Sequence, residues 1–136
     1  IDFGTAVTFD IINPNGQYTG GIIAPGLSAM TDYLHEKTAL LPRITLRDPG
    51  TGIGRSTVQA MQIGAVYGYR GLIQSLIKEV KASLKVRRLT VVATGGQARL
   101  LSKQIPEISE VRPLLTLEGL RLASAGWNCE AHTHDA

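Results

Sequence analysis

Apolar and polar positions alternate most clearly near the start of the chain, over residues 6–13. Such a period of two is typical of a strand with one buried face. The positions of the apolar face are Val7, Phe9 and Ile11. A Pro-Asn-Gly turn follows, and a second β-rich run continues to Pro25. The pattern predicts a β-hairpin over residues 6–25, with a bulge or a close backbone approach at Gly20–Gly21.

Helical spacing predicts a short helix over residues 26–36 and a long helix from Ser56 or Thr57 to about Lys85. Between them, residues 38–54 form a long loop with a short extended piece over 43–46. The apolar stripe expected on the long helix is Val58, Met61, Ala65, Leu72, Leu76 and Val80.

Three glycines, Gly64, Gly68 and Gly71, interrupt the middle of the long helix. Each costs roughly 1 kcal/mol relative to alanine in a helix. We expect close packing against another helix or backbone to offset this cost.

The remaining elements alternate between strand and helix. We expect a buried strand over residues 88–94, a helix over 97–104, a short strand near Val111, and a helix from about Thr116 to Ala125. The order of elements predicts an α/β domain. We expect the domain to occupy residues 1–126 and residues 127–136 to form a polar tail.

Composition narrows the class of protein. The chain has 136 residues, 43% of them hydrophobic, which suits one folded domain. No apolar run reaches the ~18 residues that span a bilayer, so we expect no membrane association. The single cysteine excludes an internal disulfide and fits a reducing cytoplasm.

The net charge is +3, and the densest basic cluster lies at the end of the long helix. Its members are Lys78, Lys81, Lys85, Arg87 and Arg88. Basic residues there complement the helix dipole, while a nucleic-acid patch is the alternative. Because no aromatic residues are interleaved with the bases, we expect no nucleic-acid partner.

Two short glycine turns have the residue types that bind phosphate. Asp2-Phe3-Gly4-Thr5 places a carboxylate, a glycine and a hydroxyl where a strand turns back. Thr94-Gly95-Gly96 follows an apolar strand and precedes a helix, the usual context for nucleotide contacts. Each stretch alone is equally compatible with an ordinary structural turn.

Two other candidates are weaker. Residues 49–57, PGTGIGRST, miss the P-loop pattern at Pro49 and Arg55. They still bring the hydroxyl of Thr57 to the start of a helix, which is a plausible site for a polar small molecule. The tail residues Cys129, His132, His134 and Asp135 have metal-ligand types, but a frayed terminus is the better interpretation.

Several stretches in one fixed order resemble the type III pantothenate kinases. They are DFGTA and TFD near the start, YTGGIIAPGL, TALLP, IGRST, ATGG and LTLEGL. The resemblance covers about residues 1–122. It implies an actin-like ATPase fold built from two ribonuclease-H-like halves, of which this chain is the second, with most of its first strand missing.

The resemblance also implies a function. Members of that family transfer phosphate from ATP to pantothenate, the first step of coenzyme A synthesis. They need Mg²⁺ and a monovalent cation (K⁺ or NH₄⁺), and they work as homodimers. By resemblance, Gly4, Thr5, Gly95 and Gly96 contact ATP. Asp2 binds potassium, and Thr57 contacts pantothenate.

The catalytic aspartate of the family belongs to a Gly-x-Asp-Arg motif upstream of the position of Ile1, so we expect no catalytic residue within these residues. We therefore expect a fragment that is inactive alone. Two alternatives remain open: a non-catalytic relative that acts as a regulatory or binding protein, and a remnant whose glycine-bearing helix face only mediates dimerisation.

Overall fold

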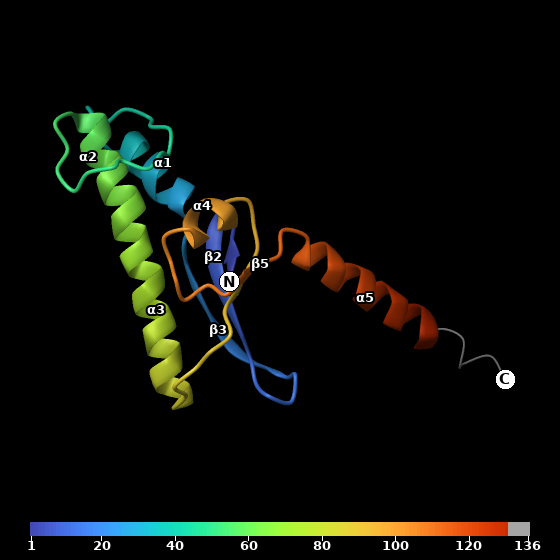
Figure 1. The fold of residues 1–136 in the computed structure, drawn as a ribbon. Helices are drawn as coiled ribbons and strands as arrows, with labels where there is room; N and C mark the ends of the chain where they lie inside the picture. The colour runs from blue at the N-terminus through green and yellow to red at the C-terminus, as the bar shows by residue number, and fades with distance from the viewer. Residues whose placement is uncertain (131–136) are drawn as a thin grey trace.

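The fold is mixed α/β, with a β-hairpin at its centre and a long helix along one side (Figure 1). A computed structural model describes the backbone of residues 1–130 and the side chains of residues 1–126. The strands are β1 (Asp2–Phe3), β2 (Ala6–Ile12), β3 (Tyr18–Pro25), β4 (Val92–Ala93) and β5 (Glu110–Val111). The helices are α1 (Leu27–Lys37), α2 (Thr57–Ile63), the π-helical turn η1 (Gly64–Gly68), α3 (Tyr69–Leu84), α4 (Ala98–Ser102) and α5 (Leu115–Glu130).

The predicted hairpin is confirmed. Strands β2 and β3 pair antiparallel, and the register shifts between Ile11 and Ile12 as a bulge requires. Gly20 has a φ of +130°, and a Cβ on Gly21 would lie 2.3 Å from the carbonyl oxygen of Phe9. Both glycines are therefore needed, one for its backbone angle and one for the close approach of the two strands.

The two residues of β1 join the hairpin to the parallel pair β4 and β5. Asp2 pairs antiparallel with Thr8 and forms a parallel bridge with Thr94. The N–H of Phe3 donates to the carbonyl of Thr94, and the N–H of Thr94 donates to the carbonyl of Ile1, both at 2.8 Å. The regular strand expected over residues 88–94 is shorter than predicted, covering Val92–Ala93 only.

The long helix begins where predicted. The side chain of Ser56 accepts a hydrogen bond from the N–H of Gln59, and Lys85 ends the helix in the left-handed conformation. Elements α2, η1 and α3 follow one another without a break in helical backbone angles.

The expected stripe on this helix is partly wrong. Val58 is exposed, and Leu72 and Leu76 are only half-buried. The side chains buried beyond η1 are Tyr69, Ile73, Ile77 and Val80. The π-helical turn explains the difference, because its wider i→i+5 spacing rotates the following turns relative to a uniform α-helix.

The expected close packing at the helix glycines is also wrong for the described chain. A Cβ added at Gly64, Gly68 or Gly71 would meet no atom within 4 Å. No neighbouring element within residues 1–126 occupies this surface, so packing inside the chain does not offset the cost of these glycines.

Other boundaries shift in smaller ways. Residues 43–46 form no strand, and α5 starts at Leu115 and continues to Glu130, beyond the expected end at Ala125. Between residues 1 and 130, no helix is long and apolar enough to cross a membrane. The core lies between the sheet, α3 and α4, and its largest fully buried side chains include Tyr69, Phe3, Leu27, Ile73 and Leu101.

Candidate functional site

The turn between β1 and β2 is held in place by its own backbone and by the start of α1. The N–H of Gly4 donates to the carbonyl of Ala6 at 3.1 Å, and the N–H of Gly26 donates to the carbonyl of Thr5 at 2.9 Å. A Cβ on Gly26 would lie 2.2 Å from the Thr5 carbonyl oxygen. Gly26 thus lets α1 begin directly on the turn, which leaves Gly4 and Thr5 exposed to solvent.

The turn after β4 lies directly on β1. Gly95 has a φ of +93°, and a Cβ there would lie 2.4 Å from the Oδ1 atom of Asp2 and 2.7 Å from the backbone of Phe3. Only glycine tolerates both the angle and the contact. The structure therefore brings Asp2, Gly4 and Gly95 together from two stretches far apart in the sequence, with Thr5 and Gly96 exposed on the same two turns.

These turns share one edge of the sheet with a third segment. Strands β1, β4 and β5 run parallel, and each turn follows the carboxyl end of its strand. Arg112 follows β5 at the same edge, and its backbone N–H donates to the carbonyl of Ala93 at 2.8 Å. In open α/β sheets, ligands bind outside the carboxyl ends of the parallel strands.

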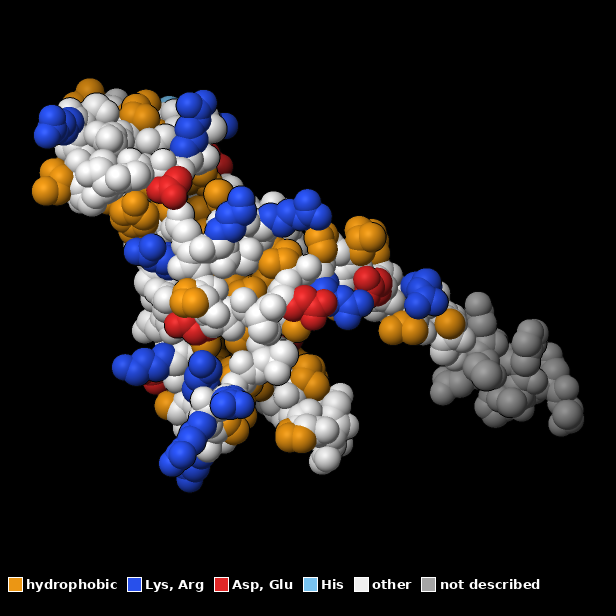
Figure 2. Space-filling view, in the orientation of Figure 1, with side chains coloured by type: hydrophobic (Ala, Val, Ile, Leu, Met, Phe, Trp, Pro, Cys, Tyr) orange, Lys and Arg blue, Asp and Glu red, His pale blue; other side chains and the backbone are white. Residues whose placement is uncertain are grey.

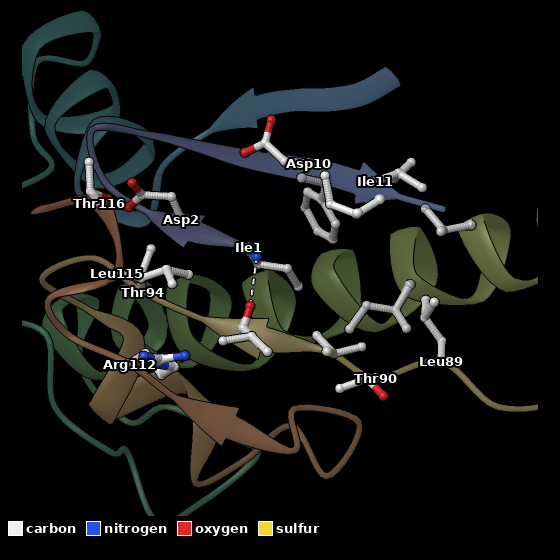
Figure 3. A pocket seen from close by; sticks show the side chains of 16 residues that line it. Ile1, Asp2, Asp10, Ile11, Leu89, Thr90, Thr94, Arg112, Leu115 and Thr116 are labelled. Atoms are coloured by element: carbon white, nitrogen blue, oxygen red, sulfur yellow. Dashed lines mark hydrogen bonds between the residues drawn. The ribbon is translucent and has the colours of Figure 1, made fainter. Parts of the chain in front are cut away.

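A cleft of about 600 Å³ borders this edge (Figure 3). Asp2, Thr94, Arg112 and Thr116 supply polar groups to its lining. Sequence reasoning missed Arg112 and Thr116. Arg112 comes directly after the second parallel strand, and Thr116 is the second residue of the helix that follows. This order is the signal that points to both, because it predicts the same sheet edge.

The charges in this region are unevenly paired. Arg112 forms ion pairs with Glu110, at 3.8 Å, and with Glu118 at the start of α5. Within residues 1–126, Asp2 has no ion pair, although its side chain is half-buried. A half-buried carboxylate that no described arginine or lysine pairs with suits a bound cation.

Comparison with known proteins identifies the family. The family model for type III pantothenate kinase matches residues 1–79. A type III pantothenate kinase from Methylacidiphilum infernorum is 52% identical over 90% of this chain, and one from Akkermansia muciniphila is 55% identical over 94%. This chain belongs to the type III pantothenate kinase family.

The chain spans about half the length of these pantothenate kinases: 45% of the M. infernorum protein and 52% of the A. muciniphila protein. A solved structure from Campylobacter jejuni, named for the Baf family of transcriptional activators, also resembles it. That structure has a TM-score of 0.52 and 24% identity, over 88% of this chain and 53% of its own. At this identity the likeness concerns the fold alone.

Thr57, the candidate pantothenate contact in this family, is not brought to the sheet edge. It is the exposed first residue of α2, which Figure 1 shows away from the strand β1. The preceding loop packs on the helix through Gly54, where a Cβ would lie 2.5 Å from the backbone nitrogen of Ala60. No strand leads into this loop within the described chain, so the strand-turn-helix context of a P-loop is missing.

The candidate metal-ligating side chains of the tail lie outside the part of the chain that the structure describes. His132, His134 and Asp135 lie outside the described residues, as does the side chain of Cys129. In the part of the chain that the structure describes, no group of three or more His, Cys, Asp or Glu side chains is arranged to hold a metal ion.

Proposed function

We propose that this chain is the nucleotide-binding half of a kinase that transfers a phosphoryl group from ATP to pantothenate, in the cytoplasm, as the first step of coenzyme A synthesis. The observation that carries the proposal is the convergence of two glycine turns and a half-buried carboxylate at the carboxyl edge of parallel strands. Membership of the pantothenate kinase family supplies the substrate class.

In this proposal, Gly4, Thr5, Gly95 and Gly96 hold ATP. The turns expose Gly4, Thr5 and Gly96, and the positive φ of Gly95 brings backbone close to Asp2. Exposed glycine turns of this kind favour phosphate oxygens, because free backbone N–H groups and a hydroxyl can donate hydrogen bonds to them.

Asp2 is proposed to hold the monovalent cation, K⁺ or NH₄⁺, beside the phosphates. The donor set fits in part, since Asp2 offers one carboxylate that has no ion-pair partner within residues 1–126. Bound cations, including Mg²⁺ with ATP, would offset the negative charge of the phosphates. Thr57 is proposed as a pantothenate contact on the family resemblance and on its exposed hydroxyl.

We propose a ribonuclease-H-like topology for this half. The order β3-β2-β1, continued through the Asp2–Thr94 bridge to β4 and β5, supports it: an antiparallel hairpin on one side and parallel strands on the other. We also propose a homodimer. The open surface at Gly64, Gly68 and Gly71 is consistent with a neighbouring molecule at this helix.

Phosphoryl transfer needs a positioned nucleophile as well as neutralised phosphates. The proposal assigns the base that activates pantothenate to the upstream half of a longer chain. Residues 1–136 alone are then expected to bind ATP without transferring phosphate.

The test compares residues 1–136 with a longer chain that joins them to the upstream half of the M. infernorum relative. Only the longer chain is expected to release ADP when pantothenate is added, and sedimentation velocity on it reports the dimer. Thr5→Val should weaken ATP binding about tenfold by calorimetry, the scale of one lost hydrogen bond to a charged group. Thr45→Val, on an exposed loop, is the matched control.

Pantothenate-dependent ADP release by residues 1–136 alone would contradict the assignment of the base. A longer chain that binds ATP but never phosphorylates pantothenate would favour a non-catalytic binding protein instead.

A further inference from the structure

A basic surface covers the end of α3 and the first residues after it. Its members are Lys78, Lys81, Lys85, Arg87 and Arg88, all exposed except the half-buried Lys81. Figure 2 shows Lys and Arg side chains gathered over this end of the helix. Because this segment leads into β4, the basic surface lies at the amino end of the parallel strands, away from the turns proposed to hold ATP. The nucleotide site therefore does not account for it.

The basic surface carries the whole net positive charge of the chain. Residues 78–88 contain five of the 14 basic residues and one of the 11 acidic ones, so the rest of the chain has nine basic and ten acidic side chains, a net charge of −1. The C-terminus of a helix carries roughly half a negative elementary charge, which a single base already offsets. Within residues 1–126, none of the five bases forms an ion pair. Most of this charge is thus not neutralised by the described chain itself.

A groove of about 420 Å³ adjoins the basic surface. Lys78 and Lys81, three residues apart on one side of α3, line it together with Gln74, Ile77 and Glu107. The Nε2 atom of Gln74 donates to both carboxylate oxygens of Glu107, at 3.3 and 3.2 Å. Among the described residues, that carboxylate forms no ion pair with either lysine. The groove therefore offers two ammonium groups beside an apolar side chain.

The chain reversal after α3 holds the rest of the basic surface in place. Lys85 has a φ of +54°, and its N–H donates to the carbonyl of Ala82 at 3.1 Å. The N–H of Val86 donates to the carbonyl of Lys81 at 3.2 Å, which completes the usual pair of bonds at a left-handed helix end. Leu84 and Val86 are 39% and 40% exposed, so apolar surface lies among the charges. Apolar groups surrounded by polar ones are typical of a protein–protein interface.

We propose that the basic surface and its groove bind an acidic segment of another protein, with one carboxylate of that segment held between Lys78 and Lys81. Charge complementarity decides the choice of partner. Residues 71–90 contain no aromatic side chain, so the surface has neither a stacking platform for nucleic-acid bases nor an aromatic anchor for a bilayer. The proposal is independent of the kinase function.

The test titrates an oligoglutamate peptide into the 136-residue chain at an ionic strength of ~0.15 M, where the Debye length is about 8 Å. Backbone amide NMR shifts report where and how tightly the peptide binds. The surface variant combines three substitutions of exposed bases: Lys78→Gln, Arg87→Gln and Arg88→Gln. The control variant changes the net charge equally at three exposed bases elsewhere: Lys37→Gln, Lys103→Gln and Arg121→Gln.

The peptide is expected to shift the amides of residues 74–88. The surface variant should bind it about tenfold more weakly, the scale of a few exposed ion pairs. The control variant should lose less than about twofold, because charges farther away than the Debye length are screened. Both variants should keep the urea midpoint of the parent chain, since the changed side chains are exposed.

A second pair of variants tests the groove. Glu107→Gln removes the negative charge beside Lys78 and Lys81 and should strengthen peptide binding about two- to threefold. Glu36→Gln, at an exposed position of α1, changes the net charge equally and should have no measurable effect. Equal losses in the two triple variants, or equal effects of the two glutamate variants, would overturn the proposal, because net charge alone would then explain binding. So would a chain that ignores the peptide but binds phosphatidylserine vesicles or duplex DNA through the same bases.

Discussion

Helices α3 and α5 are both 16 residues long, yet they stand in opposite environments. Helix α3 buries Tyr69, Ile73, Ile77 and Val80 beneath the sheet. In α5, Leu117, Leu120 and Leu122 are 61%, 61% and 62% exposed, and the helix extends away from the body of the molecule (Figure 1). Figure 2 shows hydrophobic side chains on this projecting arm, between charged ones. Forming a helix and burying it are therefore separate events in this chain.

The spacing of the apolar residues explains part of the difference. In α3 they recur at intervals of three or four, which collects them on one side. In α5, Leu115 and Leu122 fall on one side, and Leu117 and Leu120 fall on the opposite side. A helix that is apolar on two faces must pack against protein on both faces to be buried. Within residues 1–126, no element packs against both faces of α5.

The largest expected effect comes from shortening one apolar side chain in each of the two helices. Ile73→Ala should lower the free energy of unfolding by about 2–5 kcal/mol, because Ile73 is fully buried and its loss leaves a cavity. Leu120→Ala should change it by no more than about 0.5 kcal/mol. Urea denaturation measures both. A Leu120 variant as costly as the Ile73 variant would mean that α5 is packed against a partner in solution.

A second pair extends the contrast between enclosed and open positions to the proposed phosphate turn. Gly95→Ala should cost about 1–3 kcal/mol, because its φ is +93° and the new Cβ would collide with Asp2 and Phe3. Gly96→Ala meets no atom within 4 Å and should have a small effect on stability. Thermal melting of both variants checks this, and equal losses would argue against the close contact of the two turns.

The smallest expected effect concerns the pH dependence of stability at Tyr69, one of the buried residues of α3. Burial raises the pKa of Tyr69 to about 12, although a backbone hydrogen bond with Leu27 offsets part of the shift. The unfolded chain loses this proton near pH 10, before the folded chain does. Stability from the neutral phenol is therefore complete below pH 10 and falls as the pH rises toward 12.

Tyr69→Phe should remove this part of the alkaline loss of stability. Urea midpoints measured between pH 8 and pH 11 test it, with Tyr33→Phe, an exposed tyrosine, as the control. An identical pH dependence in wild type and the Tyr69 variant would show that another group dominates the alkaline transition.

Local pattern was enough for several elements. Alternation and the Pro-Asn-Gly turn predicted the hairpin, helical spacing predicted α1, and Ser56 predicted the start of the long helix. The pantothenate kinase family also followed from the order of its motifs. The hairpin and the helix starts depend on residues close together in the chain, and the family followed from short motifs in a fixed order along it, so neither needed the tertiary structure.

Contacts between distant segments decided the rest. A sequence pattern assumes a uniform helical period, and the turn at Gly64–Gly68 departs from it, so Tyr69 and Ile73 replaced Leu72 in the core. The grouping of Asp2 with Gly95, and the place of Arg112 beside them, depends on strands that pair across about ninety residues of chain. The sequence by itself determined where most helices and the hairpin would form, because those preferences are local. Only the tertiary structure decided which faces are covered, because burial depends on the surface that lies opposite.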